Sequence, residues 1–313
     1  MADAAAPVRG AVADHLLLFN TDAFHALNLR PGQRVRRIDH EVDGRLVGSL
    51  VGVVDGDGFR SGHSAPFGGP DLVRDAEATA TVAEALGAAV ARLDADGVGA
   101  IRIKARPAFY SAAEPAVQFA LLNLGFAVEA CELNLHIDLA PLRDADDYVA
   151  SLRSPARRAL KHALREPFAL HEARDEGAWE RGYRVLESNR AAKGRRLALS
   201  LDYTRAARDA FPGRVRMWVL EHSGAACAAA LVYRVAPARE LVVYWGDAGH
   251  DLPRSPMNAL ALRLVERVLG EGGLSLDLGV SSVAGVPDQG LIQFKRSVLA
   301  RESLRLDLVR HAP

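Results

Sequence analysis

One lysine in this sequence occupies a position where a ligand-facing cation is expected. Residues Leu274 to Leu278 alternate between apolar and polar types, which predicts a strand, and Gly279 ends the run. A loop of small residues follows, and Asp288 begins a predicted helix that carries Phe294 and Lys295. Open α/β sheets bind ligands at the carboxyl ends of their strands. We therefore expect Lys295, one helical turn past the loop, to face a ligand.

The strand Leu241 to Trp245 supplies further candidates beside that loop. Tyr244 is either a core aromatic residue or a hydrogen-bonding acid. Asp247 directly follows the strand, where it either helps to position an amine or caps the loop. Arg254 is the one cation of the next loop, Gly246 to Pro256, and is a candidate for binding substrate.

Two groups of mostly basic residues are candidates for binding, the first as a clamp for a phosphate and the second for a ligand. The first lies on one predicted helix, with several members three or four residues apart: Arg153, Arg157, Arg158, Lys161 and Arg165. Arg157 and Arg158 are its strongest binding candidates, and the alternative is a solvated helix face. The second group follows a helix and comprises Asn189, Lys193, Arg195 and Arg196. A helix C-terminus also explains Lys193, because its charge complements the helix dipole.

Small residues in two loops are the remaining candidates. Gly68 and Gly69 precede Pro70, at which we expect a helix to begin. They either hold an anion at that helix N-terminus or form a tight turn. Ser281 and Ser282, in the loop before Asp288, are hydrogen-bonding residues for the substrate or for the loop itself.

The sequence predicts neither a metal site nor a covalent nucleophile. His63 and His250 occupy matching loops, but no histidine or carboxylate stands near them at metal-ligand spacing. No G-x-S-x-G elbow or Cys–His pair is present. Cys131 and Cys227 are expected to pack as small hydrophobic side chains.

Charge and composition limit the possible partners. The chain of 313 residues has 39 basic and 39 acidic side chains, so its formal net charge is zero and no global field attracts nucleic acid or anionic membranes. No apolar run approaches the roughly 20 residues of a membrane span. The N-terminus carries Asp3 and lacks a signal pattern. We therefore expect a cytoplasmic protein of bacterial type.

The same order of elements occurs twice, at an offset of about 180 residues. Gln33 to Arg36 resembles Gly213 to Arg216, and the hairpin turns Asp43-Gly44 and Ser223-Gly224 follow at matching places. A third strand is clear after the second turn and only hinted at by Phe59 after the first. Repeated order over this length indicates duplicated domains.

Each copy reads as helices, a three-stranded antiparallel run, a helix, a strand, a helix and a last strand. This order predicts an α/β fold in which each mixed antiparallel and parallel sheet is flanked by helices. We expect an N-terminal domain over residues 1–140 and a C-terminal domain over 141–313, with sharing of its last strand by the first domain as an open alternative. The long helices are expected at Leu72 to Asp94 and at Met257 to Gly270, and Asp144 to Leu164 as a helix interrupted at Pro155.

The element order is similar to the GNAT acyltransferase fold, and its duplication resembles the FemAB-type branch. Asp277 to Ser282, Gln289 to Leu291 and Phe294-Lys295 resemble the signature of that branch, D-hydrophobic-G-x-S followed by G-L-x-x-F/Y-K. Ser64 to Gly69 resembles its Gly-Gly element. The loop before the second long helix has Gly249 as its only internal glycine and so departs from the usual acetyl-CoA motif.

The resemblance implies transfer of an acyl or aminoacyl group to an amine or hydroxyl of a small-molecule or cell-envelope precursor. The donor would be acyl-CoA or aminoacyl-tRNA, a co-substrate, with no tightly bound cofactor. Lys295 would stabilise the developing oxyanion or a donor phosphate. The second copy would hold the reaction centre and the degenerate first copy part of the acceptor site. We expect a monomer, because a duplicated chain carries its own pseudo-dimer. The alternative is a catalytically silent module that binds a nucleotide sugar or peptide.

Overall fold

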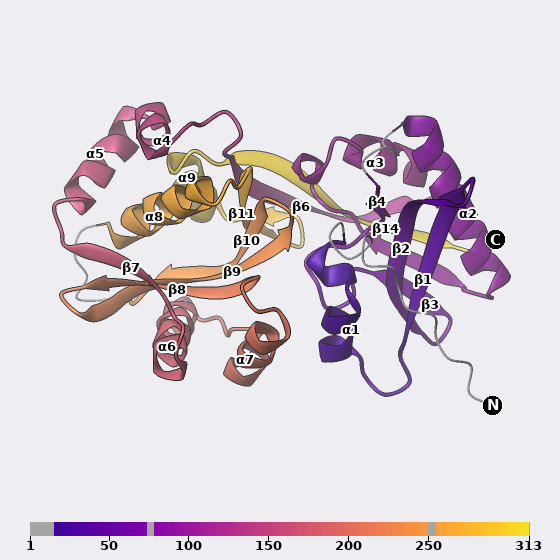
Figure 1. Cartoon of the computed structure of the whole chain (residues 1–313), viewed down its shortest axis with the longest axis horizontal. Coiled ribbons are helices and arrows are strands. Elements are labelled where there is room, and N and C mark those ends of the chain that lie inside the picture. The colour runs from indigo at the N-terminus through magenta and orange to yellow at the C-terminus, as the bar shows by residue number, and fades with distance from the viewer. Residues whose placement is uncertain (1–15, 74–77, 250–254, 313) are drawn as a thin grey trace. The chain divides into compact units, whose positions relative to one another are not determined.

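A computed structural model describes residues 16–73, 78–249 and 255–312 (Figure 1). Contacts divide the chain into two compact units. The first contains the chain up to Cys131 and returns to include the residues from Leu304 onwards, and the second runs from Glu132 to Ser303. No helix in the described residues is both long and apolar enough to cross a lipid bilayer.

The first unit is a mixed sheet with two helices packed on one face. Its elements are η2 Leu18–Asn20, α1 Asp22–Asn28, β1 Arg34–Val42, β2 Arg45–Asp55, β3 Gly58–Ser61, β4 Asp71–Leu72, α2 Thr79–Ala95, β5 Ala100–Lys104, η4 Ala108–Tyr110, α3 Glu114–Asn123 and, from the end of the chain, β14 Arg301–His311. The strand order is β1-β2-β3-β5-β14, with β4 beside β2. Only the β3–β5 pair is parallel among these.

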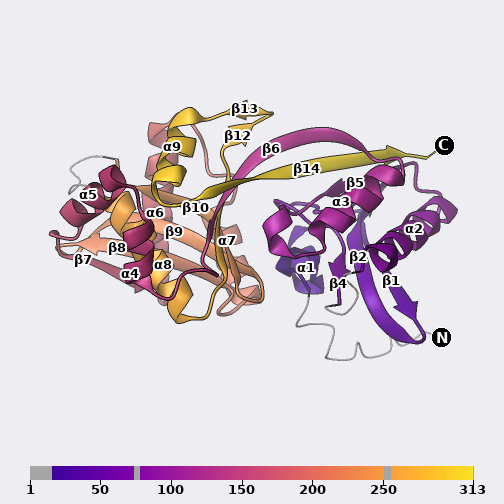
Figure 2. The ribbon, with the colours of Figure 1, turned by 90° about the horizontal axis from the view of Figure 1, so that it is seen from above.

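Apolar residues at alternate strand positions meet the inner faces of α2 and α3, which lie side by side (Figure 2). This core includes Leu50, Phe59, Ile101, Ile103 and Leu308 from the strands, and Val82, Leu86, Leu93, Val117 and Leu121 from the helices. Phe59 belongs to β3, so the third strand hinted at in the first copy is present.

The prediction that a helix begins directly after Pro70 is wrong. Asp71 and Leu72 form β4, which pairs with Ser49 and Gly48 of β2, and α2 begins only at Thr79. The φ of proline suits an extended chain as well as a helix start, so Pro70 can precede a strand.

The second unit is a mixed sheet with helices on both faces. Its elements are α4 Ala145–Ser151, α5 Ser154–Ala163, β7 Phe168–Glu172, α6 Glu176–Ala192, α7 Leu201–Ala210, β8 Val215–His222, β9 Ala225–Ala236, β10 Arg239–Asp247, α8 Pro256–Gly270, β11 Ser275–Val280, β12 Ser282–Val283, β13 Val286–Pro287 and α9 Gln289–Ser297. The strand order is β6-β11-β10-β9-β8-β7, in which β6 is Ala127–Asp138 and β10 and β11 run parallel. In Figure 1, α4, α5, α8 and α9 cover one face of this unit and α6 and α7 the other. The α/β fold class predicted from the sequence is confirmed.

Local sequence signals account for several of these boundaries. Both hairpin turns have positive φ at both central residues, as a type I′ turn requires, with 50° and 71° at Asp43 and Gly44 and 51° and 81° at Ser223 and Gly224. The predicted break near Pro155 is confirmed, because α4 ends at Ser151 and α5 begins with Pro155 in its first turn.

Two strands have residues in both units. Residues up to Cys131 of β6, Ala127–Asp138, belong to the first unit, and the remainder pairs with β11 of the second. Residues Asp307 to His311 of β14 pair with β5 of the first unit. The predicted division after residue 140 into two domains stays a prediction.

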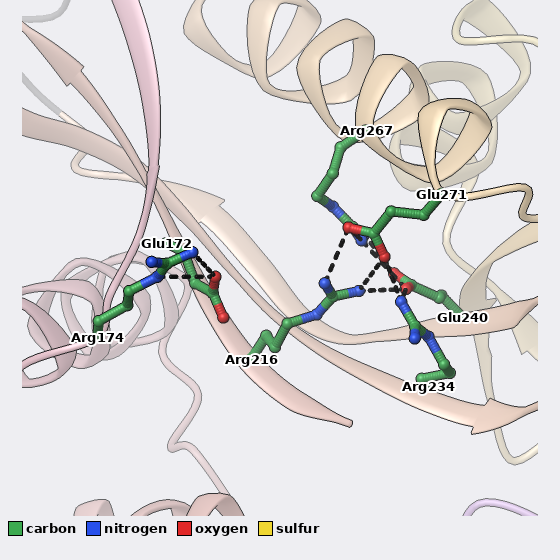
Figure 3. Close-up of polar contacts among 7 residues, drawn as sticks. All are labelled: Glu172, Arg174, Arg216, Arg234, Glu240, Arg267 and Glu271. Atoms are coloured by element: carbon green, nitrogen blue, oxygen red, sulfur yellow. Dashed lines mark hydrogen bonds and ion pairs between the residues drawn. The ribbon is translucent and has the colours of Figure 1, made fainter. Parts of the chain in front are cut away.

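A buried cluster of ion pairs joins the amino-terminal end of β10 to its neighbours in the second unit (Figure 3). The Glu240 carboxylate, whose side chain is 3% exposed, accepts hydrogen bonds from Arg216 of β8 and Arg267 of α8. Glu271 accepts from Arg216 at 2.9 Å and also pairs with Arg234 of β9. Both Arg216 and Arg267 stack near the Trp218 ring, 5.4 and 4.6 Å from its centroid. The cluster ties the end of α8 to three strands.

Replacing the central carboxylate tests this account. Glu240→Gln leaves the buried Arg216 and Arg267 without their main counter-charge, so the free energy of unfolding should fall by about 3–5 kcal/mol. Urea denaturation at neutral pH measures it. The matched control is Glu302→Gln, which breaks the exposed pair with Arg296 and should cost less than about 1 kcal/mol. Equal losses in the two variants would contradict the buried role of Glu240.

Candidate functional site

A cavity of about 670 Å³ opens in the second unit where the parallel strands β10 and β11 end. Its walls come from the ends of these strands, the last turn of α6, the start of α8 and the first turns of α9. Parallel neighbours leave the carboxyl ends of both strands at one edge, which is where such sheets take up ligands. The described polar lining consists of Asn189, Arg190, Lys193, Arg195, Tyr244, Asp247, Ser255, Asp288 and Lys295.

Lys295 lies in the wall of this cavity and is nearly enclosed by protein, with 1% of the residue exposed. Asp288 starts its helix as the N-cap, since its Oδ1 accepts from the Leu291 backbone N–H at 3.0 Å. Two turns of α9 then bring Ile292 and Lys295 to the same buried face. The Lys295 Nζ donates to the backbone carbonyl oxygens of Gly279 at 2.8 Å and Val280 at 3.0 Å.

Those carbonyl groups belong to an irregular end of β11. The register with β6 shifts between Asp277 and Val280, and Gly279 has φ of 70°, which suits glycine. The fully buried Asp277 carboxylate accepts from the Gly279 N–H and from Asn134 Nδ2, both at 2.8 Å. The Asp277 carboxylate therefore holds the bend at Gly279, and this bend directs the Gly279 and Val280 carbonyls towards Lys295.

Burial disfavours the charged form of the lysine. Loss of hydration lowers the pKa of Lys295 to about 7; Asp277 and Asp288 oppose the shift, and Arg190 adds to it. Near neutral pH both protonation states of this amine are accessible, which is the condition for a group that moves a proton or responds to charge.

Tyr244 and Asp247 also line the cavity. The Tyr244 hydroxyl accepts from the Ala198 N–H at 3.2 Å, and the Arg190 guanidinium lies 5.0 Å from the centre of its ring. Asn189 Nδ2 donates to the Asp247 backbone oxygen at 3.0 Å and to its Oδ1 at 3.3 Å. The structure thus brings the three predicted catalytic residues to one cavity, and their catalytic roles stay predictions.

Asn189 is a positioning residue that the sequence did not single out from its basic neighbours. Its Oδ1 accepts from Lys193 Nζ at 3.0 Å, so the same amide holds Lys193 and Asp247. Gly246 makes room for it, because a Cβ on Gly246 would lie 2.4 Å from the Asn189 Cγ. The signal available in the sequence was a glycine directly before an aspartate at the end of an aromatic strand.

The lining is more basic than acidic. Among its described residues Arg190, Lys193, Arg195 and Lys295 are basic, whereas Asp247 and Asp288 are acidic. Arg195 reaches Asp288 only at 3.8 Å. Arg190 was not predicted, although it lies on α6 one turn before Lys193 and next to Asn189. An anionic ligand is favoured by this balance of charge.

Other predicted binding residues are located elsewhere. Arg157 and Arg158 lie on α5, half-buried and exposed respectively, outside the described cavity lining. Ser281 is buried one residue past the lining, with its backbone N–H bonded to the Leu133 oxygen at 2.7 Å. Arg254, like His250, lies outside the described residues. A group of three metal-ligating side chains is absent from the described chain.

Gly68 and Gly69 belong to the first unit, where their loop lies against the ends of the parallel pair β3 and β5. The Gly68 N–H donates to the Lys104 oxygen at 2.8 Å, and Arg106 Nε donates to the Gly68 oxygen at 3.1 Å. A Cβ on Gly68 would lie 2.4 Å from the Gly62 nitrogen. Close backbone packing therefore explains this glycine, and the pair does not precede a helix.

Comparison with solved structures places this architecture among known folds. The chain is similar to FemX, with a TM-score of 0.72 at 12% identity over 94% of this chain and 92% of that one. It is also similar to the C-terminal domain of a putative lysylphosphatidylglycerol synthetase from Agrobacterium fabrum (TM-score 0.60, 12% identity, 96% and 90% covered). L-PGS from Bacillus licheniformis gives a TM-score of 0.54 at 12% identity, with 88% and 83% covered.

These likenesses show the fold alone. They confirm the FemAB-like fold expected from the sequence. No protein-family model matches the chain, and no curated protein matches it.

The low pKa of Lys295 has a consequence for stability. Between pH 7 and 10.5 the unfolded chain binds a proton that the folded chain lacks, so the free energy of unfolding should rise with pH across that window. Lys295→Met should remove this rise, which approaches about 1.4 kcal/mol per pH unit. Urea denaturation between pH 7.5 and 9.5 measures the two slopes.

Lys193→Met is the control for that experiment. Lys193 is exposed at the end of α6, so its variant should keep the wild-type slope. Parallel pH profiles for the wild type and Lys295→Met would show that Lys295 keeps its proton in the folded chain.

Proposed function

We propose that the protein, which has the fold of FemX and of lysylphosphatidylglycerol synthetases, transfers an acyl or aminoacyl group from an activated donor to an amine or hydroxyl. The observation that carries the proposal is the buried Lys295 in the wall of a cavity at the ends of β10 and β11. A fixed cation in a site shielded from water stabilises negative charge far better than one in bulk solvent.

The cavity residues take distinct roles in this reaction. Lys295 stabilises the oxyanion that forms when the nucleophile attacks the acyl carbonyl. Asp247, held by Asn189, positions the attacking amine. Tyr244 donates a hydrogen bond to the departing group, from a hydroxyl that already accepts the Ala198 N–H.

The donor is a phosphate-bearing thioester or ester, either acyl-CoA or aminoacyl-tRNA. Arg190, Lys193 and Arg195 supply charges for its phosphates on the α6 side of the cavity. Arg190 is the best placed of the three, because it is half-buried and its guanidinium lies over the Tyr244 ring. The acceptor is a small molecule or a precursor of the cell envelope.

Removal of the buried cation tests the reaction. Purified protein is incubated with a panel of acyl-CoAs and aminoacyl-tRNAs and with amine and hydroxyl acceptors, and products are identified by mass spectrometry. Lys295→Ala should lower kcat by about 100-fold to 1000-fold, as expected for loss of an oxyanion-stabilising group. Arg296→Gln is the matched control on the same helix, because Arg296 is exposed and pairs with Glu302.

Unchanged turnover in Lys295→Ala would contradict the assigned role. Tight donor binding without turnover across the panel would instead favour the alternative, a silent module that binds a nucleotide sugar or peptide.

The basic wall of the cavity makes a separate prediction about binding. Arg190→Gln should weaken binding of coenzyme A, or of uncharged tRNA, by about 10-fold to 100-fold, the range expected for one charge-assisted hydrogen bond. Isothermal titration calorimetry measures both probes. Arg184→Gln, an exposed position on α6 paired with Glu180, should bind like the wild type. Equal affinity of the Arg190 and Arg184 variants for both probes would remove Arg190 from the donor site.

A further inference from the structure

The Lys295 amino group can act either as a hydrogen-bond donor or as an acceptor at one position, depending on whether it is protonated. Its Nζ has three positions besides the bond to its own side chain, and the Gly279 and Val280 carbonyl oxygens occupy two of them at 2.8 and 3.0 Å. Carbonyl oxygens only accept hydrogen bonds, so each of these positions must carry a hydrogen in either protonation state. The third position is used by neither carbonyl, and Lys295 is among the residues that line the cavity.

A neutral amine has two hydrogens and one lone pair. With both hydrogens directed at the two carbonyls, the lone pair occupies the third position. An ammonium has three hydrogens and therefore presents an N–H at the same place. Because the two carbonyls hold the other positions of Nζ, protonation of Lys295 replaces a hydrogen-bond acceptor by a donor at the third position. The side chain does not need to move.

We propose that Lys295 is the general base of the reaction: its neutral amine takes the proton of the attacking amine or hydroxyl and returns it to the leaving group. This inference rests on the proposed acyl transfer and adds a proton path to it. It assigns the base to the same group that then stabilises the oxyanion, because the amine becomes a cation at the moment the tetrahedral intermediate forms.

The step balances within the two substrates and the lysine. The nucleophile forms a bond to the acyl carbon while the carbonyl π electrons move to oxygen, and its proton passes to the Lys295 lone pair. The oxyanion then reforms the carbonyl, the bond to the donor sulfur or ribose oxygen breaks, and the ammonium protonates that atom. Lys295 ends neutral, as it began.

The charged groups that face Lys295 come from three elements. Asp277 of β11 and Asp288 at the start of α9 favour the ammonium, whereas Arg190 of α6 disfavours it, and burial disfavours it most. The burial and the arginine together hold the pKa of Lys295 near 7, so the neutral form is present under ordinary conditions. An anionic donor beside Arg190 would stabilise the ammonium and so match the second half of the reaction.

The first experiment follows the lysine directly in the intact wild-type chain. Protein labelled with ¹³C at lysine Cε and ¹⁵N at Nζ is titrated by NMR from pH 5 to 10, and the Lys295 signal is assigned by its loss in Lys295→Arg and in Lys295→Met. We expect a single titration with a midpoint near 7. A Lys295 that remains protonated up to pH 9 would overturn the inference whether or not the protein transfers acyl groups.

The second experiment measures the pH dependence of turnover, with whichever donor of the acyl-CoA and aminoacyl-tRNA panel is used. The wild-type rate should rise through the NMR midpoint and then level off. Lys295→Arg keeps a cation that can bond the carbonyls but cannot accept a proton, so it should lose about 100-fold or more in kcat together with that pH limb. Lys295→Gln, which is uncharged, should also lose the rise of the rate with pH. Agreement between the two variants excludes a folding defect caused only by arginine.

The outcomes separate the two proposals. Turnover by Lys295→Arg at the wild-type rate, or a wild-type rate independent of pH between 6 and 8, would overturn the base role and leave acyl transfer intact. No turnover of any donor would overturn the proposed function, and the proton path with it, even if Lys295 titrates near 7.

Discussion

The burial of one amine is the constraint on which the candidate site depends. Lys295 is 1% exposed, and an ammonium removed from water is costly unless its hydrogens have acceptors. The acceptors are backbone carbonyls, which requires β11 to bend at Gly279 and Asp277 to fix the bend. Asp288 must in turn begin α9 at the right residue for the side chain to reach inward. The Asp288 cap, the bend at Gly279 and the Asp277 carboxylate therefore all serve to place Lys295 and its hydrogen-bond acceptors.

The two units use their parallel strand pairs differently. In the second unit the ends of β10 and β11 border the cavity. In the first unit the loop from Gly62 to Pro70 lies over the ends of β3 and β5, where Lys104 donates to the Ala65 oxygen at 3.2 Å. Arg106 is buried there between Asp71 and Glu114. Side chains and a loop therefore fill the space at the ends of β3 and β5 in the first unit, whereas the ends of β10 and β11 in the second unit border a cavity.

Much of the second unit could be predicted from the sequence because its signals are local. Asp-Gly and Ser-Gly turns, alternating strands and the Asp288 cap each act within a few residues. Lys295 was identified because it follows a strand, a loop and a helix start in direct succession. The order of elements, repeated in both halves, indicates the fold more strongly than any single residue does.

The residues that the sequence did not reveal depend on contacts between distant segments. Arg190 and Asn189 reach the cavity only because α6 packs against β10, and nothing near them in the chain indicates that packing. Arg157 and Arg158 formed a convincing stripe, yet the buried face of α5, with Ala156 and Leu160, is what sets its orientation. Pro70 precedes β4 and not a helix, because the φ of a proline suits an extended chain as well as a helix start.

The position of β14 sets an order on biosynthesis. Lys104 and Asp307 are partners in the sheet of the first unit, yet all of the second unit lies between them in the chain. The ribosome therefore synthesises β1 to β5 long before β14. Until β14 is made, the backbone groups of β5 on that edge lack their hydrogen-bond partners. Such an edge invites pairing with other nascent chains. Packing of α2 and α3 onto the sheet, or a chaperone, would limit such pairing until β14 is made.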